Sequence, residues 1–352
     1  MERGLRVLAL ALAMCAIVVG CSGGERGASG QNAGGEAAKG RERGQTSDAS
    51  EPPLEDDLGH QAYMRPTRLV VPAAAGDTLD HVARMAAGLS ESPLGTTIFV
   101  DRRPGEGGLL AWRDVAGEEP DGHQLAYVTE GLLALEGLGS GVRLSDFEMV
   151  AQIDSGSAVL GVRKDPEAES FQVSVEDFEG FVSAAKEDLG LVEVADPGPN
   201  TVYRAGTLAL EREAGIDLAP KSLGKAPTEA LYDGDVEAVL VPADEVLTNV
   251  WAGELRAIAI LGDERSADLP NIPTAKELGY DVSVPVWGGV AVPAETPPPV
   301  VDELGRAFVA SSSSRTFGRA LLGTGREPTQ RGPGAFARSV EEQTRFLSKD
   351  DP

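Results

Sequence analysis

The chain has 352 residues, of which 41% are hydrophobic, and a formal net charge of -25 at pH 7. Such acidity argues against nucleic acids and anionic lipid surfaces as binding partners, because like charges repel. The folded part runs from about residue 67 to residue 349 and is longer than a typical single domain, so its length predicts two lobes.

The N-terminus has the pattern of an export signal. Arg3 and Arg6 precede an apolar run, residues 7–19, that is short for a membrane span. The run ends in Val18-Val19-Gly20-Cys21, a lipobox-like sequence in which the cysteine becomes the lipidated first residue. We therefore predict a signal peptide over residues 1–20 and lipidation at Cys21, which would anchor an exported protein at the extracytoplasmic face of the cell envelope. A lone N-terminal membrane helix is the alternative.

Cysteine usage agrees with this interpretation, since the only two cysteines are Cys15 and Cys21. A mature domain would then have no disulfide and no cysteine-based metal site. Residues 21–66 are rich in Gly, Ser and Glu and almost free of large apolar side chains, so they cannot bury enough surface to offset their chain entropy. We predict a disordered tether that holds the folded part about 35–40 Å from the anchor.

Strands and helices then alternate along the chain, which predicts an α/β fold with parallel sheets. Strands are expected at residues 69–71, 97–100, 124–128, 191–194, 236–241, 255–261 and 287–292, with a strand pair or crossover over 149–162. Helices are expected from residue 77 or 78 onward and at 109–116, 175–186, 202–214, 228–233, 300–311, 316–322 and 334–347.

The first strand-loop-helix unit is the leading candidate for a ligand site. Leu69-Val70-Val71 is a β-branched run typical of a strand buried on both faces, and Pro72 ends it. A loop of small residues follows, Ala73-Ala74-Ala75-Gly76, and then Asp77 or Thr78 as the helix N-cap, with Asp80 in the first turn. Unpaired N–H groups and the helix dipole would favour an anion at this loop. An ordinary strand-helix connection without a ligand is the alternative.

Two further loops follow expected strands. Thr129, Glu130 and Gly131 come after the third strand, and residues 196–201, with Gly198, Asn200 and Thr201, precede a helix. Because ligands gather at the carboxyl ends of strands in open α/β sheets, these loops and the first are expected to converge on one cleft.

Catalytic machinery is sparse. The three histidines are His60 in the tether, His81 near the start of the first long helix and His123 in a turn, and they form no cluster or known catalytic motif. A Ser-His-Asp triad stays open as an alternative, because its members need not be neighbours in sequence. We expect a protein that is not an enzyme and that needs no metal or cofactor.

Five segments, in order, carry a resemblance to a known family. They are Val71-Pro72-Ala73-Ala74-Ala75-Gly76 with Asp80; Val100-Asp101-Arg102-Arg103-Pro104-Gly105-Glu106-Gly107-Gly108; Pro120-Asp121-Gly122-His123; Ala252-Gly253-Glu254-Leu255-Arg256-Ala257 with 265–274; and Trp287-x-Gly289 with Pro293-Ala294 and Thr296-Pro297. They resemble the first ligand loop, the RPG signature, the PDGY turn, the AGKLRAL entry and the W-x-G return of Bug-type solute receptors, which serve tripartite tricarboxylate transporters.

The resemblance implies a two-lobed periplasmic-binding-protein-like fold of type II that closes on a small organic acid. Lobe 1 would contain residues 67–163 plus 284–352, and lobe 2 residues 164–283. Permease subunits in the membrane would be the partners. The implied ligand-binding residues are Ala73, Ala74, Ala75, Gly76, Asp77, Thr78, Asp80, Thr129, Glu130, Gly131, Gly198, Asn200 and Thr201.

Departures from the family pattern bear on the ligand. Asp77 stands where the family has the second Gly of PGG, Arg102 replaces an Asn, and Glu130 adds another negative charge. Ser222-Leu223-Gly224 replaces the usual Tyr-Lys-Gly, and Val241 replaces a late Asp. Since carboxylates repel a bound carboxylate, a solute with an amino group or a cation-bridged acid would suit such a pocket if both acids face it. Asp77 that only caps the helix is the alternative, and a sensor without a transport role, or a hydrolase on the same scaffold, remain alternative functions.

Overall fold

The structure is a computed structural model that describes residues 65–164, 175–187 and 192–348. The predicted signal peptide, Cys21 and nearly all of the predicted tether lie outside the described residues. Within the described residues, no helix has both the length and the apolar character needed to cross a membrane.

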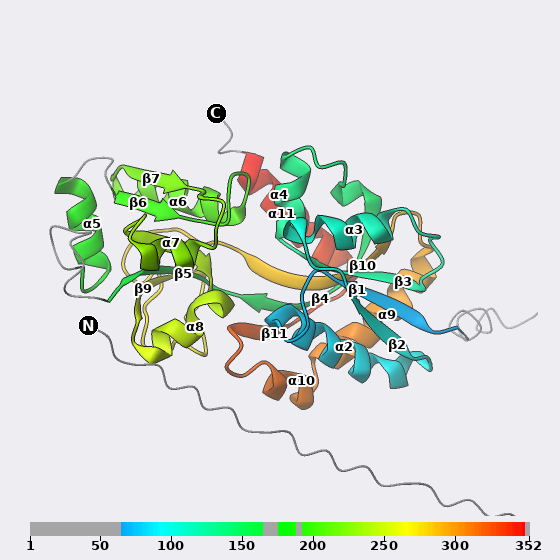
Figure 1. Cartoon of the computed structure of the whole chain (residues 1–352). Coiled ribbons are helices and arrows are strands. Elements are labelled where there is room, and N and C mark those ends of the chain that lie inside the picture. Colours follow the sequence, from blue (N-terminus) through cyan, green and yellow to red (C-terminus); the bar gives the residue numbers. More distant parts are fainter. Residues whose placement is uncertain (1–64, 165–174, 188–191, 349–352) are drawn as a thin grey trace, which may run out of the picture. The chain divides into compact units, whose positions relative to one another are not determined.

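The chain forms two β-sheets. The first has six strands in the order β11-β4-β10-β3-β1-β2, and the second has five in the order β7-β6-β8-β5-β9 (Figure 1). The strands of the first sheet are β1 (Thr67–Val71), β2 (Ile98–Arg102), β3 (Gln124–Thr129), β4 (Phe147–Gly156), β10 (Val286–Pro293) and β11 (Arg326–Arg331). Those of the second are β5 (Ala158–Arg163), β6 (Val192–Ala195), β7 (Leu218–Lys221), β8 (Ala238–Pro242) and β9 (Leu255–Leu261).

Both sheets are mixed, so the prediction of parallel sheets is wrong in part. β1 pairs in parallel with β2 and β3, but β10 runs antiparallel to β3 and β4, and β11 antiparallel to β4. In the second sheet β5 runs antiparallel to β8 and β9. The antiparallel strands are those that cross between the sheets or return after a crossing, and local hydrophobic pattern does not encode strand direction.

Helices cover both faces of each sheet (Figure 1). Those on the first sheet are α2 (Thr78–Leu94), α9 (Pro298–Ser312) and α10 (Arg315–Ala320) on one face, and α3 (Leu109–Ala116), α4 (Gly131–Gly137) and α11 (Pro333–Ser348) on the other. Those on the second are α5 (Phe178–Glu187) and α6 (Val202–Ala214) on one face, and α7 (Pro227–Asp233) and α8 (Ala243–Ala252) on the other. Short 3₁₀ turns occupy Glu106–Gly108 and Leu144–Asp146.

Strand β1 shows how the sequence selects this layered packing. Leu69 and Val71 pack with α2 and α9, whereas Val70 points to the opposite face and packs with Trp112 of α3. All three strand residues are fully buried, which confirms the prediction of a strand buried on both faces.

The chain passes between the sheets at Ser157, between β4 and β5, and again between Leu261 and Val286. Because β5 pairs in the second sheet, the first crossing precedes residue 163, where we placed the end of the first part of lobe 1. The second predicted boundary, at residue 284, falls within the second crossing. The division into lobe 1, residues 67–163 plus 284–352, and lobe 2, residues 164–283, stays a prediction.

Most predicted helices and strands are present with ends shifted by a few residues, and α3, α6 and β9 have the predicted bounds. Strands β7 and β11 and helices α4 and α8 were not predicted. Two of these, α8 and β11, contribute to the site described next.

Candidate functional site

The loop after β1 folds back on its own carboxylates. The Ala74 N–H donates to Asp77 Oδ2 over 2.8 Å, and the Gly76 N–H donates to Asp80 Oδ2 over 3.0 Å. Gly76 has φ +92°, a conformation that favours glycine. Two backbone donors of the proposed anion loop are therefore already bonded to acidic side chains of the same segment.

Asp77 is the residue before α2, as predicted, but its side chain makes no cap hydrogen bond to the helix. Its carboxylate instead bonds to Ala74. The first N–H groups of α2 therefore have no side-chain cap, and the positive end of the helix dipole adjoins an exposed loop, residues 74–77. The alternative that the Asp77 side chain only caps α2 is therefore wrong.

Asp80 is only 1% exposed and is neutralised by arginine. Arg102 Nε donates to its Oδ1 over 2.6 Å, and Arg84 lies 3.5 Å away. Burial raises the pKa of Asp80, but the Gly76 N–H, Arg102 and Arg84 outweigh burial and hold that pKa below its ordinary value. Arg102, where the family has Asn, thus balances the charge of Asp80.

Glu130, after β3, lies at the junction of the two sheets. The Tyr203 hydroxyl of α6 donates to its Oε1 over 2.9 Å, and the Trp287 N–H at the start of β10 donates to its Oε2 over 3.2 Å. Glu130 is 8% exposed, and burial raises its pKa although Arg326, the N–H of Trp287 and Tyr203 act in the opposite direction. Thr129 Oγ1 accepts from the Gly131 N–H over 3.2 Å, which fixes the turn into α4.

A buried ionic network lies behind Glu130. Arg326 of β11, 4% exposed, contacts Asp154 of β4 and Asp244 of α8, each at 3.3 Å. The Tyr127 hydroxyl donates to Asp154 Oδ2. Burial raises the pKa of Asp154, against the attraction of Arg326. Nε of Arg326 and Oδ1 of Asp244 make no hydrogen bond in the described residues, so this ion pair is imperfectly aligned.

Two glycines let this network form. A Cβ on Gly288 would lie 2.0 Å from the Tyr127 hydroxyl and 2.4 Å from Asp154 Oδ2. A Cβ on Gly325 would lie 2.6 Å from the Asp244 backbone nitrogen. Any side chain at either position would displace the buried carboxylates from their partners.

The loop before α6 satisfies its polar groups internally. Asp196 Oδ1 accepts from the Gly198 N–H over 2.9 Å, and Thr201 caps α6 by accepting from the Arg204 N–H over 3.1 Å. Arg204 also binds the Asp196 carboxylate at 2.6 Å and 3.0 Å. Asn200 lies against Gly137 of α4, where an added Cβ would be 3.2 Å from the Asn200 Cβ.

The structure therefore joins the loop at 129–131 to the first turn of α6, directly after the loop at 196–201, through the Glu130–Tyr203 bond. No hydrogen bond joins loop 73–78 to either of them in the described part of the chain. Sequence reasoning missed Tyr203, Asp154, Asp244 and Arg326. The signal for them is weak, because each acts through partners that lie between 27 and 172 positions away.

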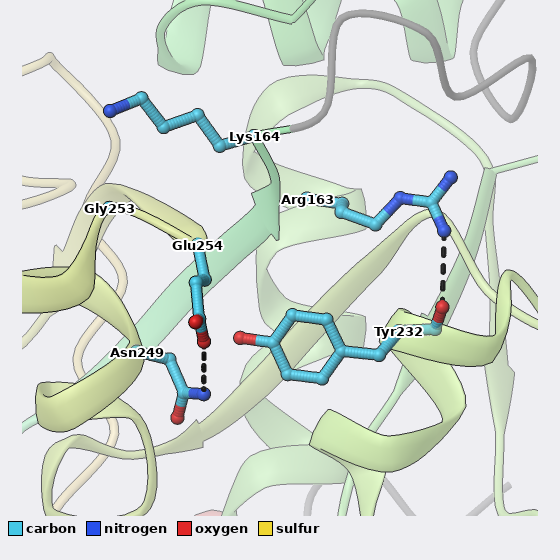
Figure 2. A pocket seen from close by; sticks show the side chains of 6 residues that line it. All are labelled: Arg163, Lys164, Tyr232, Asn249, Gly253 and Glu254. Atoms are coloured by element: carbon cyan, nitrogen blue, oxygen red, sulfur yellow. Dashed lines mark hydrogen bonds between the residues drawn. The ribbon is translucent and has the colours of Figure 1, made fainter.

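The described surface also has two hollows. One, of about 710 Å³, is lined by Arg163, Lys164 and Tyr232 and by the end of α8 (Figure 2). In it the hydroxyl of Tyr232 and Nε of Arg163 are buried without a hydrogen bond to the described residues. The other, of about 340 Å³, lies against both crossings, Ser155–Ser157 and Ser283–Trp287. No group of three or more His, Cys, Asp or Glu side chains in the described ranges has the arrangement of a metal site.

Known proteins resemble this chain over nearly all of its folded part. BugT of Bordetella pertussis is 28% identical over 275 residues, which cover 75% of this chain and 81% of that protein. A solute-binding protein from Polaromonas, solved without ligand, is 26% identical with a TM-score of 0.67, covering 81% of this chain and 97% of that one.

A third relative, MatC from Rhodopseudomonas palustris, was solved with bound malate. It is 27% identical with a TM-score of 0.65, and the match covers 81% of this chain and 99% of MatC. These likenesses show the two-lobed type II fold of periplasmic solute-binding proteins.

Residues 82–347, from α2 to α11, match the family described as "Tripartite tricarboxylate transporter family receptor". That range includes both sheets apart from β1, and it spans more than half of the 352 residues. The chain therefore belongs to the tripartite tricarboxylate transporter receptor family, whose Bug-type members are solute-binding receptors.

Proposed function

We propose that this protein is a lipid-anchored extracytoplasmic receptor that captures a small organic acid or related metabolite for a tripartite tricarboxylate-type permease. The observation that carries the proposal is the family match over residues 82–347. A relative solved with malate supports an organic acid as the solute class. Closure of the lobes around the solute would create the surface that the permease recognises.

Direct binding tests the receptor function. We expect isothermal titration of the full-length chain against malate, succinate, adipate and their amino-bearing analogues to give one-site binding with at least one compound. A thermal-shift screen of organic acids, amino acids and amines run beforehand would choose the compounds. If none of these classes shifts the melting temperature or releases heat, the proposal fails.

The charges at the site narrow the expected solute. Asp77 and Asp80 already occupy two N–H groups of the first loop, and Glu130 occupies donors at the junction. A solute carboxylate entering near them would meet like charges. A solute with an amino group, or an acid bridged by a cation, would offset them, so we place amino-bearing metabolites ahead of simple dicarboxylates.

The anchor has its own test. Cys21 follows a lipobox-like sequence, and the described residues contain no helix suited to span a membrane. We expect Cys21→Ala to release the protein from the membrane pellet, whereas the unchanged chain stays there after a carbonate wash. A Cys21→Ala protein that remains in the washed pellet would contradict lipidation as the anchor.

A further inference from the structure

The carboxylate of Glu130 is held by donors that come from different parts of the fold. Its Oε1 accepts from the Tyr203 hydroxyl at 2.9 Å and its Oε2 from the Trp287 N–H at 3.2 Å. Tyr203 lies in the first turn of α6, beside the second sheet, while Trp287 is the second residue of β10 in the first sheet. One donor for each oxygen is the arrangement that an ionised carboxylate requires, since it can only accept.

These donors are withdrawn from water. Tyr203 is 4% exposed and Trp287 1% exposed, so either group would lose a hydrogen bond without compensation if Glu130 were removed. Arg326 supplies the nearby positive charge, which it shares with Asp154 and Asp244. The hydroxyl and the backbone N–H together make a carboxylate subsite, and the chain fills it with its own side chain.

The subsite lies where a solute of this fold is expected. Glu130 directly follows the carboxyl end of β3, and Tyr203 follows the loop at the carboxyl end of β6. Ligands of α/β sheets bind at these ends. A solute carboxylate that bridged the two lobes here would need the donors that Glu130 already holds.

We infer that Glu130 is a built-in carboxylate that occupies a carboxylate subsite, so that the solute presents a neutral or amino-bearing end at this position. This inference extends the proposed function, and only its statement about the solute rests on that function. The subsite itself does not depend on transport. It can therefore be tested by filling the site with a small carboxylate.

The test removes the side chain and supplies its head group from solution. In the full-length chain, Glu130→Ala and Glu130→Ser each open a vacancy lined by the Tyr203 hydroxyl and the Trp287 N–H. We expect acetate or formate to raise the melting temperature of both variants by about 3 °C over chloride at equal ionic strength, because a ligand that binds only the folded state stabilises it. The unchanged chain, whose subsite is filled, should show no difference between the salts.

Two further variants separate a specific subsite from a general salt effect. Glu130→Gln keeps the vacancy filled with an amide, so acetate should have no effect on it. Tyr203→Phe combined with Glu130→Ala removes one donor, so the acetate response should fall by more than half. An equal acetate response in Glu130→Gln and Glu130→Ala would overturn the inference.

If Glu130→Ala and Glu130→Ser fold in chloride and acetate does not raise their melting temperatures, the inference is wrong. If they fold only in acetate or formate, it is supported, and if they stay unfolded in all three salts it is overturned, because a filled subsite should restore folding.

The effect of Glu130 on the charge of the solute is tested by a separate measurement, solute affinity. Compared with the unchanged chain, Glu130→Ala should bind succinate at least tenfold more tightly, and an amino-bearing analogue should lose affinity. If acetate raises the melting temperature of Glu130→Ala but no solute binds to the variant or to the unchanged chain, the subsite is supported and the receptor function is rejected. Unchanged succinate affinity in a variant that acetate rescues would reject Glu130 as a determinant of solute charge.

Discussion

The loop after β1 and the junction around Glu130 both place carboxylates on backbone N–H groups, but they balance the charge differently. In the loop, Asp77 is exposed, and Asp80 has arginines and an N–H group that lower its pKa. At the junction, two buried acids, Glu130 and Asp154, and the partly exposed Asp244 lie near one buried guanidinium, and burial raises the pKa of the first two. The loop is thus stabilised by its ionised acids, whereas the junction bears a desolvation cost for them.

This difference indicates where solute charge can be selected. An exposed carboxylate can exchange its N–H partner for water at small cost, so the loop can adapt to a solute. A buried carboxylate with matched donors cannot leave without stranding them. We therefore expect the junction to set which solute group is accepted, and the loop to adjust affinity.

The largest expected effect comes from removing the guanidinium at the junction. Arg326→Met would leave the buried Asp154 and the partly exposed Asp244 without their cation, and breaking such a buried ion pair costs about 3–5 kcal/mol of unfolding free energy. Arg102→Met in the loop should cost less, about 1.5–3 kcal/mol, because Asp80 keeps Arg84 and the Gly76 N–H. Urea unfolding at neutral pH measures both.

A matched control lies on the same strand as Arg326. Arg331 is exposed and bonds to the neutral side chains of Gln152 and Ser339, so Arg331→Met should cost under about 1 kcal/mol. If Arg326→Met were as mild as Arg331→Met, the ionic network at the junction would carry no stability, and the contrast with the loop would fail.

The opposite pKa directions predict opposite pH dependence. Asp80 has a lowered pKa, so its contribution to stability is present above the ordinary value of 3.8 and lost as the pH falls through the folded value. Glu130 and Asp154 have raised pKa values, so the folded state binds more protons than the unfolded one, and stability is lost as the pH rises through their folded values.

Glu245 in the first turn of α8 gives the clearest window. Although Glu245 is an exposed residue, desolvation of its carboxyl by the surrounding protein atoms, and then the charge of Asp244, raise its pKa from 4.5 to about 7. The unfolding free energy should therefore fall less between pH 4.5 and about pH 7 in Glu245→Gln than in the unchanged chain. The side chain is exposed, so solvent screening makes the effect smaller than the shift implies. Urea unfolding over a pH series measures this change, with Glu148→Gln at an exposed position of β4 as control. Parallel pH curves for both variants and the unchanged chain would reject the prediction.

The sequence predicted the loop far better than the junction. Strand β1, the small-residue loop and α2 follow one another, so local pattern and turn chemistry suffice to place Asp77 and Asp80 together. The junction is assembled from strands and helices that are distant in sequence. Arg326 lies in Arg-Glu-Pro-Thr-Gln-Arg, an edge strand with no alternating apolar pattern, and it meets Asp154 across 172 positions.

Helix α8 was not predicted either, but for a different reason. Its acidic first turn, Asp244 and Glu245, and the αL glycine at its end, Gly253, are helix signals that were present in the sequence. The order and spacing of the family motifs predicted the fold even though α8 and β11 were not predicted. The site needed three-dimensional contacts, because Tyr203 lies in none of the family motifs and the W-x-G motif gives no sign that the Trp287 N–H binds Glu130.

The smallest expected effect concerns the loop itself. Asp77→Gly would free the Ala74 N–H and remove a negative charge from the uncapped N-terminus of α2, which restores the family's small residue at that position. A carboxylate would then gain a donor and lose a repulsion, together worth about 0.3–1 kcal/mol at an exposed helix end, so its Kd should fall about two- to fivefold. Isothermal titration of succinate against Asp77→Gly and the unchanged chain measures this, and Asp77→Asn, which removes the charge while keeping a side-chain acceptor for Ala74, separates the two contributions. Equal succinate affinity in all three proteins would show that the loop does not sense solute charge, and the selection would then lie at the junction alone.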